Sequence, residues 1–135
     1  MTEEFRQEMM ERMDRDAFNR LHGFRLTKLE AGRSVVEVEL TPAHMNIWGH
    51  PHGGILFSLA DIACGTATRA LCGGHTVTAS SSINYLYASM NAKSLRAEGT
   101  VIKKGHSLVV VQAEVYDNED NHLLTGQFTM YISQE

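Results

Sequence analysis

Cysteine and proline are scarce in this chain, with two residues of each among 135. The two cysteines, Cys64 and Cys72, fall on one predicted helix, about 12 Å apart along its axis. A disulfide requires Cα atoms within about 7 Å, so these two cysteines cannot bridge each other. Both prolines fall within residues 41–54, together with three glycines, and this composition is typical of a loop.

An excess of positive charge is also missing, since the formal net charge is −4. This charge gives no electrostatic reason to expect nucleic acid or an anionic membrane as a partner. No apolar run reaches the roughly 18 residues of a membrane span, and the acidic segment MTEEFRQEMM lacks a signal-peptide core. We therefore expect a cytoplasmic protein, folded as a single domain over residues 1–135.

Several catalytic and cofactor signatures are absent. Ser58 is not part of a G-x-S-x-G nucleophile elbow, and no phosphate-loop or dinucleotide glycine pattern is present. His44, His50 and His52 lie close together in the sequence, but no carboxylate lies in that loop, and zinc prefers three or four ligands. We therefore expect no metal site.

Hydrophobic periodicity predicts the secondary structure. Residues 2–21 are predicted to form an amphipathic helix, because apolar side chains recur every four positions from Phe5 to Ala17. Alternating valines and glutamates within residues 24–40 predict a hairpin. Further strands are predicted at about 76–87, 94–103, 107–117 and 122–133.

Residues 53–72 are predicted to form a second helix that is apolar on nearly every side, and such a helix is normally buried. The order of helix, hairpin, buried helix and four long strands favours an α+β architecture. In this arrangement a long antiparallel sheet wraps around one central helix.

Asp61 is the only charged side chain between Gly53 and Thr68. A buried, unpaired carboxylate costs several kcal/mol or takes up a proton. Asp61 is therefore either paired with a hidden partner or functional. Gly53 and Gly54 open the same helix, and their N–H groups can approach a ligand oxygen closely. One element thus carries a carbonyl-polarising site and a base or nucleophile.

The spacing between these two features predicts an oligomer. Gly53 and Asp61 lie about 12 Å apart along the helix axis, whereas a reacting group must come within about 3–3.5 Å of a bound carbonyl. One chain cannot supply both at one site. Two copies with antiparallel central helices place Gly53 of one opposite Asp61 of the other, which gives a two-fold dimer with two composite sites.

The pattern of Asn46, Gly49, His52-Gly53-Gly54 and Asp61 resembles the hotdog-fold acyl-CoA thioesterases of the phenylacetate-type (PaaI-like) branch. The segments SINYLY and KKGHSLVVVQAEVYDNEDNHLLTGQFTMYI resemble that family's central strand and closing hairpin. The resemblance implies a homodimer or a dimer of dimers with active sites at the subunit interface. It also implies an acyl-CoA substrate and no cofactor beyond the coenzyme A that the substrate carries.

The resemblance assigns roles to individual residues. The Gly53 N–H receives the thioester carbonyl oxygen, and Asp61 activates water or attacks directly to form an anhydride. Asn46 helps to place the thioester or the water, with His52 beside it. A serine or threonine early in the following strand assists the carboxylate. Thr78 aligns best with that position, and Ser80 and Ser81 remain alternatives.

The chain departs from the family pattern at Tyr87-Ala88, where related sequences often have Arg-Pro. Coenzyme A phosphates would then need other basic residues, and the candidates flank a predicted turn at Gly105, which could equally be a solvated turn. Trp48 could line an acyl pocket or simply pack. The expected binding residues are Gly54, Tyr85, Lys103, Lys104 and His106.

Two other functions compete with thioester hydrolysis. A hotdog hydratase or dehydratase needs a base at the Cα or Cβ carbon of the acyl chain, usually a histidine in another loop context. The His-Gly-Gly spacing argues against that chemistry. A non-catalytic acyl-CoA-binding module would normally carry a further domain. The sequence leaves open the acyl group, the choice between dimer and tetramer, and whether Asp61 acts as base or nucleophile.

Overall fold

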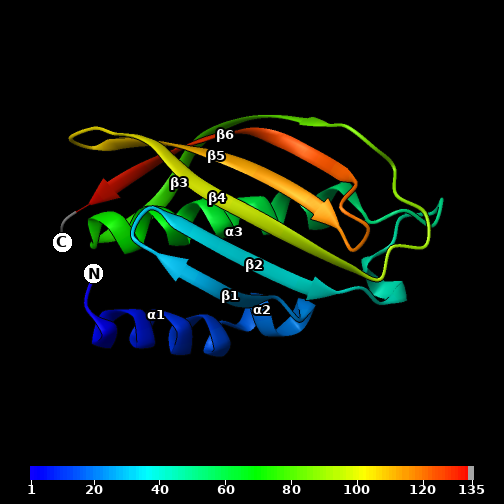
Figure 1. Cartoon of the computed structure of the whole chain (residues 1–135), viewed down its shortest axis with the longest axis horizontal. Coiled ribbons are helices and arrows are strands. Elements are labelled where there is room, and N and C mark those ends of the chain that lie inside the picture. The colour runs from blue at the N-terminus through cyan, green and yellow to red at the C-terminus, as the bar shows by residue number, and fades with distance from the viewer. Residues whose placement is uncertain (134–135) are drawn as a thin grey trace.

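The computed structural model describes residues 1–133 and shows a six-stranded antiparallel sheet wrapped around one long helix (Figure 1). The strand order is β1-β2-β4-β5-β6-β3. This confirms the predicted α+β hotdog architecture with an extra N-terminal helix. The strands are β1 (Arg25–Glu30), β2 (Arg33–Glu39), β3 (His75–Tyr85), β4 (Ser94–Lys104), β5 (Leu108–Asp117) and β6 (His122–Ser133).

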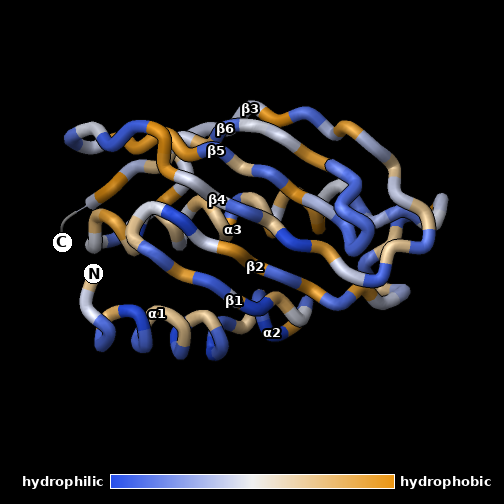
Figure 2. The backbone as a smooth tube through the Cα atoms, viewed as in Figure 1, coloured by the Kyte–Doolittle hydropathy of each residue, from blue (hydrophilic) through white to orange (hydrophobic). Residues whose placement is uncertain are grey.

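Alternating hydropathy makes the sheet two-faced. In β5, valine or alanine at every second position from Val109 to Val115 is fully buried against the helix, and the intervening residues are half-buried or exposed (Figure 2). Strands β4, β5 and β6 have 10–12 residues, which exceeds the usual strand length. They can be this long because the central helix has 20 residues and provides an equally long apolar surface.

The central helix α3 spans Gly53–Cys72, as predicted. Its inner face packs so closely on β4 that a Cβ at Gly99 would lie 2.6 Å from the backbone oxygen of Ala63. The Ser34 hydroxyl donates to that same oxygen at 2.6 Å. The helix is long and apolar enough to pass a membrane-span test by length and composition alone, but the enclosing sheet makes it a core helix.

The predicted N-terminal helix over residues 2–21 is two helices, α1 (Glu3–Arg15) and α2 (Ala17–His22). Asp16 breaks it with an extended backbone and caps α2 by accepting a hydrogen bond from the Asn19 N–H at 3.1 Å. The apolar spacing continues across the break, so periodicity alone does not reveal it. Aspartate is one of the preferred N-cap residues, so Asp16 itself is the signal that could have done so.

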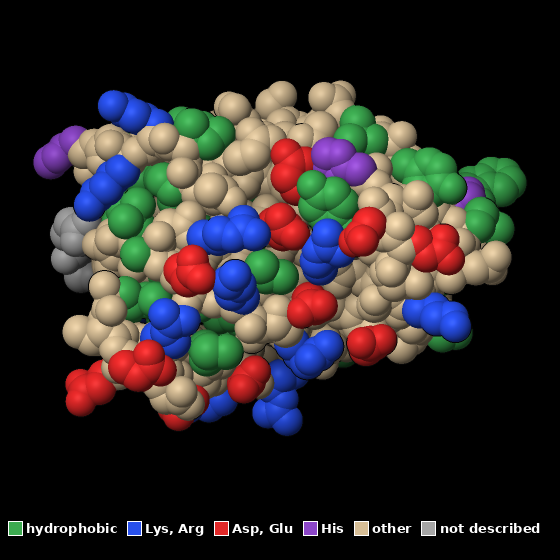
Figure 3. Space-filling view, in the orientation of Figure 1, with side chains coloured by type: hydrophobic (Ala, Val, Ile, Leu, Met, Phe, Trp, Pro, Cys, Tyr) green, Lys and Arg blue, Asp and Glu red, His purple; other side chains and the backbone are tan. Residues whose placement is uncertain are grey.

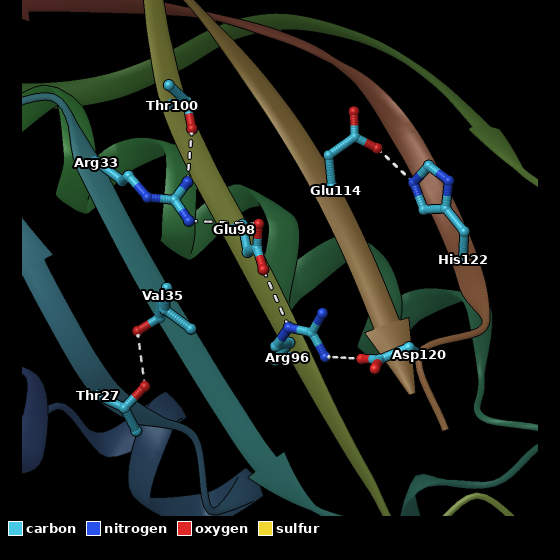
Figure 4. Close-up of polar contacts among 9 residues, drawn as sticks. All are labelled: Thr27, Arg33, Val35, Arg96, Glu98, Thr100, Glu114, Asp120 and His122. Atoms are coloured by element: carbon cyan, nitrogen blue, oxygen red, sulfur yellow. Dashed lines mark hydrogen bonds and ion pairs between the residues drawn. The ribbon is translucent and has the colours of Figure 1, made fainter. Parts of the chain in front are cut away.

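The outward face of the sheet is polar. Figure 3 shows acidic and basic side chains interspersed over it. Glu98 pairs with both Arg33 and Arg96, and Arg96 also pairs with Asp120 (Figure 4). Arg33, Arg96 and Glu98 are half-buried, and linked charges of this kind contribute more to stability than isolated surface pairs while they keep this face hydrated. We therefore expect a functional cavity on the other face of the sheet, where α3 packs.

The edge strand β3 lies beside β6, and within residues 1–133 no strand pairs with its other edge. Nine of its eleven residues are exposed, an unusual pattern for a long strand. Exposed edges of this length favour pairing with another strand. The strand β3 therefore offers a natural site for a second copy of the chain.

Asp117, at the end of β5, is 3% exposed and supports two loops at once. Its carboxylate accepts hydrogen bonds from the Ser89 hydroxyl at 2.6 Å and from Asn121 and Glu119. Burial by itself raises the pKa of this carboxyl, but these hydrogen bonds outweigh burial and lower the pKa below its ordinary value. The carboxylate form therefore stabilises the fold.

We expect Asp117→Asn to lower the free energy of unfolding by about 2–3 kcal/mol at pH 7, because charge-assisted hydrogen bonds are lost. Since the folded-state pKa is depressed, this stabilisation is complete above the unfolded carboxyl pKa of about 3.9 and is lost as pH falls through the folded value. Urea denaturation at pH 7 and pH 3 should show the difference from wild type shrinking in acid. A difference equal at both pH values would contradict the assignment.

Candidate active site

The N-terminus of α3 presents one unsatisfied amide. The His52 side chain caps the helix, and its Nδ1 accepts a hydrogen bond from the Gly54 N–H at 2.9 Å. Within residues 1–133, the Gly53 N–H has no hydrogen-bond acceptor. The expectation that both glycine amides point at a ligand is therefore wrong for Gly54, because His52 occupies that amide in the single chain.

Tyr85, at the end of β3, closes over the helix start. Its hydroxyl donates to the Gly53 carbonyl at 2.9 Å, and its ring carbons lie 3.4–3.5 Å from where a Gly53 Cβ would stand. Burial raises the pKa of the Tyr85 phenol, so it stays a donor at neutral pH. A cavity of about 360 Å³ opens beside this contact, lined in part by Asn46, His50 and Tyr87.

Asn46 organises the loop before the helix rather than reaching into open space. Its side-chain oxygen accepts from the Trp48 N–H at 2.9 Å and from the His50 N–H at 3.0 Å. Two hydrogen bonds from one side chain hold the turn between them in a single shape. The side-chain amide nitrogen of Asn46 remains the group that can donate to a ligand.

A chain of hydrogen bonds ties this loop to the rest of the sheet. His50 Nδ1 lies 3.0 Å from the Ser89 carbonyl oxygen, and the Ser89 hydroxyl donates to Asp117. The predicted strands 107–117 and 122–133 leave residues 118–121 as their connection, but the sequence does not reveal its link to the site. No local pattern signals that link, because Ser89 and Asp117 are 28 positions apart.

Asp61 lies two turns along α3, on a face that the single chain leaves half-buried. The expectation of a helix enclosed on every side is thus wrong for one chain, since the sheet covers the face that carries Asp61 only in part. Thr78 of β3 donates its hydroxyl to Asp61 Oδ1 at 2.5 Å. Among the ion pairs of residues 1–133, none involves Asp61, so the carboxylate is oriented without being neutralised.

The structure therefore brings Asp61 together with Thr78, the first of three candidate helpers. The strand irregularity between Thr78 and Ser80 interrupts the pairing of β3 with β6 at this point. Such bulges commonly redirect a side chain. The alternatives Ser80 and Ser81 have no hydrogen bond to Asp61 in the described chain.

Asp61 opens into a groove of about 830 Å³ between α3, the helices α1 and α2, and the start of β3. We call it the Asp61 groove. Its apolar lining includes three methionines, whose flexible side chains adapt to different shapes. The groove residues from α1, α2, α3 and β6 include Met9, Met13, Phe18, Phe57, Ile62, Gly65, Thr66 and Met130.

Cys64 lies beneath Asp61 but cannot serve as a nucleophile at neutral pH. Its side chain is fully buried, and burial strongly raises the pKa of its thiol. The nearby Asp61 carboxylate raises that pKa further. The reactive form of cysteine is the thiolate, so Cys64 is a core residue.

Lys103, Lys104 and His106 lie apart from both Gly53 and Asp61 within one chain. They occupy the β4–β5 hairpin, at the end of the molecule where α3 finishes (Figure 1). Val101, on the same hairpin, lies with Leu71 around Gly32. A single chain therefore does not bring these basic residues to the Gly53 amide.

Comparison with known proteins identifies the family. Residues 49–123 match the model of the thioesterase superfamily. A provisionally named esterase of Saccharolobus solfataricus is 33% identical over 114 residues, which cover 84% of this chain and 75% of that protein.

Solved structures agree with this match. A hypothetical thioesterase of Streptococcus pneumoniae, solved with coenzyme A, is 28% identical with a TM-score of 0.82, covering 93% of this chain and 98% of that one. The PaaI protein of E. coli, from the phenylacetic acid degradation operon, shares the fold with a TM-score of 0.87 at 24% identity, covering 94% and 91%. These matches, with the hotdog sheet around α3, show that the chain belongs to the thioesterase superfamily.

Proposed function

We propose that this protein hydrolyses acyl-CoA thioesters at two sites shared between the subunits of a homodimer. The observation that carries the proposal is Asp61, a carboxylate with no ion pair among residues 1–133, which Thr78 orients at the edge of a large groove of mixed polar and apolar lining. The superfamily supplies the class of reaction. The coenzyme A bound to the pneumococcal neighbour supports acyl-CoA as the substrate.

The case for a shared site rests on the helix. Gly53 and Asp61 lie about 12 Å apart along α3, too far to act on one carbonyl. The half-buried face of α3 and the exposed edge of β3 are adjacent, so a second copy can cover both. Antiparallel pairing of two α3 helices places position 53 opposite 61 and Phe57 beside the two-fold axis.

In this arrangement the Gly53 N–H of one subunit donates to the thioester carbonyl oxygen and stabilises the negative charge that develops there. Asp61 of the other subunit removes a proton from water as the water oxygen attacks the carbonyl carbon. The C–S bond then breaks, and the departing sulfur takes up the proton. Alternatively, the carboxylate attacks directly, expels the thiolate and forms an anhydride that water hydrolyses. Thr78 holds one carboxylate oxygen in either route.

The remaining predicted residues take supporting parts. His52 caps the helix and so sets the direction of the Gly53 amide, and the Asn46 amide nitrogen can donate to the thioester or the water. Antiparallel pairing turns the helix start of one copy toward the later part of α3 in the other. We therefore retain Lys103, Lys104 and His106 of the second subunit as candidates for the coenzyme A phosphates.

Assaying the products distinguishes this function from its competitors. With a panel of alkyl- and aryl-CoA thioesters, we expect free thiol and a carboxylate in equal amounts, detected with a thiol reagent and by mass spectrometry. A hydratase would instead change the absorbance of an enoyl thioester without releasing thiol. A binding module would retain acyl-CoA unchanged, and either of these results across the panel would refute the proposal.

A further inference from the structure

The loop before α3 carries the two apolar side chains that stand out most from this end of the molecule. Ile47 is 90% exposed and Trp48 is 72% exposed. They occupy the tip of residues 46–50, which we call the Trp48 turn. Figure 1 shows that this loop extends past the end of the sheet. Figure 3, in the same orientation, shows hydrophobic side chains at that end of the molecule.

The Trp48 turn is rigid rather than loose. Asn46 accepts two hydrogen bonds across it, and the Asn46 N–H donates to the His50 carbonyl at 2.8 Å. Gly49 has φ +82°, a conformation that side chains with a Cβ rarely adopt. A preorganised turn that exposes an aromatic residue loses little entropy when that residue is buried by a partner, as in the anchor residues of protein interfaces.

The Asp61 groove, at about 830 Å³, is large enough to receive such an anchor, and its lining combines apolar residues with charged ones such as Arg12 and Arg69. No residue of the Trp48 turn lines the groove of its own chain. Gly65 leaves part of the groove lining without a side chain, with the Met130 methyl group 3.6 Å from where its Cβ would stand, and Met9 and Met13 also line the groove. Methionine sulfur makes favourable contacts with aromatic rings, so this lining suits an indole.

Helix register determines where the turn goes. If position 53 of one copy lies opposite 61 of the other, the chain before Gly53 continues toward positions 62–66 of that second copy. Those positions include Ile62 and Gly65, which line the groove. We propose that the Trp48 turn of each subunit inserts into the Asp61 groove of the other, where Trp48 forms a wall of the acyl site.

This inference rests on the proposed shared site and adds a specificity-determining residue supplied by the partner. The acyl chain extends from the thioester near Asp61 into the part of the groove that the indole leaves free. The size of residue 48 therefore limits how large an acyl group fits. Replacing Trp48 with alanine removes the indole and creates space, because alanine is too small to cover the part of the groove that Met9 and Met13 line.

Trp48 is the single tryptophan of the chain, so its fluorescence reports its burial directly. In the assembled wild type we expect a blue-shifted emission maximum that moves to the solvent value when dilution separates the subunits. Sedimentation of the same samples gives the oligomeric state. Solvent-like emission in the assembled protein, or an assembly that never forms, would overturn the inference.

Substitution tests the role in selectivity. We expect Trp48→Ala to weaken subunit association at least tenfold, and to raise kcat/KM for decanoyl-CoA relative to butyryl-CoA about tenfold or more. Trp48→Phe should restore most of both properties. Leu21→Ala is the matched control, because Leu21 is 79% exposed and lies outside the groove. Unchanged association and unchanged selectivity in Trp48→Ala would refute the inference.

The two proposals fail in different ways. If no acyl-CoA releases thiol, the proposed function fails, while emission and sedimentation still decide whether Trp48 is buried between subunits. If Asp61→Asn is inactive but Trp48 emits as in water within the assembly, the hydrolytic function stands and the inserted turn does not.

Discussion

Asp61→Asn should lower kcat for acyl-CoA hydrolysis by about a thousandfold, because the amide can neither accept the proton of water nor attack the carbonyl. Losing a general base typically costs 10²–10⁴-fold. The substitution preserves the shape of the side chain, and Thr78 can still donate to the amide oxygen. Steady-state thiol release, with sedimentation and thermal denaturation of the same preparation, provides the measurement.

The control for this change is Asp14→Asn, which removes an equal charge from an exposed position on α1. We expect that variant to match wild type in rate, assembly and melting temperature. An Asp61→Asn protein that keeps a near-normal kcat on a good substrate would refute the catalytic assignment. So would a loss of activity that only accompanies unfolding.

Thr78 provides a finer test of the same carboxylate. Thr78→Val removes the hydroxyl that bonds Asp61 while retaining a branched side chain, so the carboxylate loses its fixed orientation. We expect kcat to fall about 10–100-fold with KM nearly unchanged, and Thr78→Ser to recover most of the rate. If Thr78 had only a structural role, Thr78→Val would instead lower the melting temperature, without lowering kcat while KM stays nearly unchanged.

Gly99→Ala should destabilise the fold by about 3 kcal/mol, the largest effect we expect from adding one methyl group. The new Cβ would lie 2.6 Å from the Ala63 oxygen and 2.9 Å from the Cys64 nitrogen. These are backbone atoms of α3, which cannot move aside as a flexible side chain can. The helix must therefore shift away from β4, and Asp61 shifts with it.

A decrease in melting temperature of roughly 10 °C in a thermal scan would agree with this loss. Thr100→Ala is the control, because Thr100 is the next residue of β4 and is exposed on the other face. That change should cost no more than about 0.5 kcal/mol. If Gly99→Ala melts like wild type, the close helix–sheet contact does not exist in solution.

The sequence was sufficient for the elements that depend on local periodicity. Alternation over β5 and the mostly apolar composition of α3 each predicted their element to within about a residue or two. Where the prediction failed, a local polar group made a hydrogen bond that the hydrophobic periodicity does not reveal. Asp16 splits the N-terminal helix, and His52 takes the Gly54 amide that was expected to meet a ligand.

The amino-acid sequence by itself determined the order of helices and strands, the lone carboxylate on α3 and the resemblance to a thioesterase. These properties depend on spacing along the chain, which sequence records directly. Only the tertiary structure decided which face of α3 stays open, that Thr78 bonds Asp61, and that Ser89 links the Trp48 turn to Asp117. Such contacts join residues 17–39 positions apart, and their existence depends on how the sheet curves around the helix.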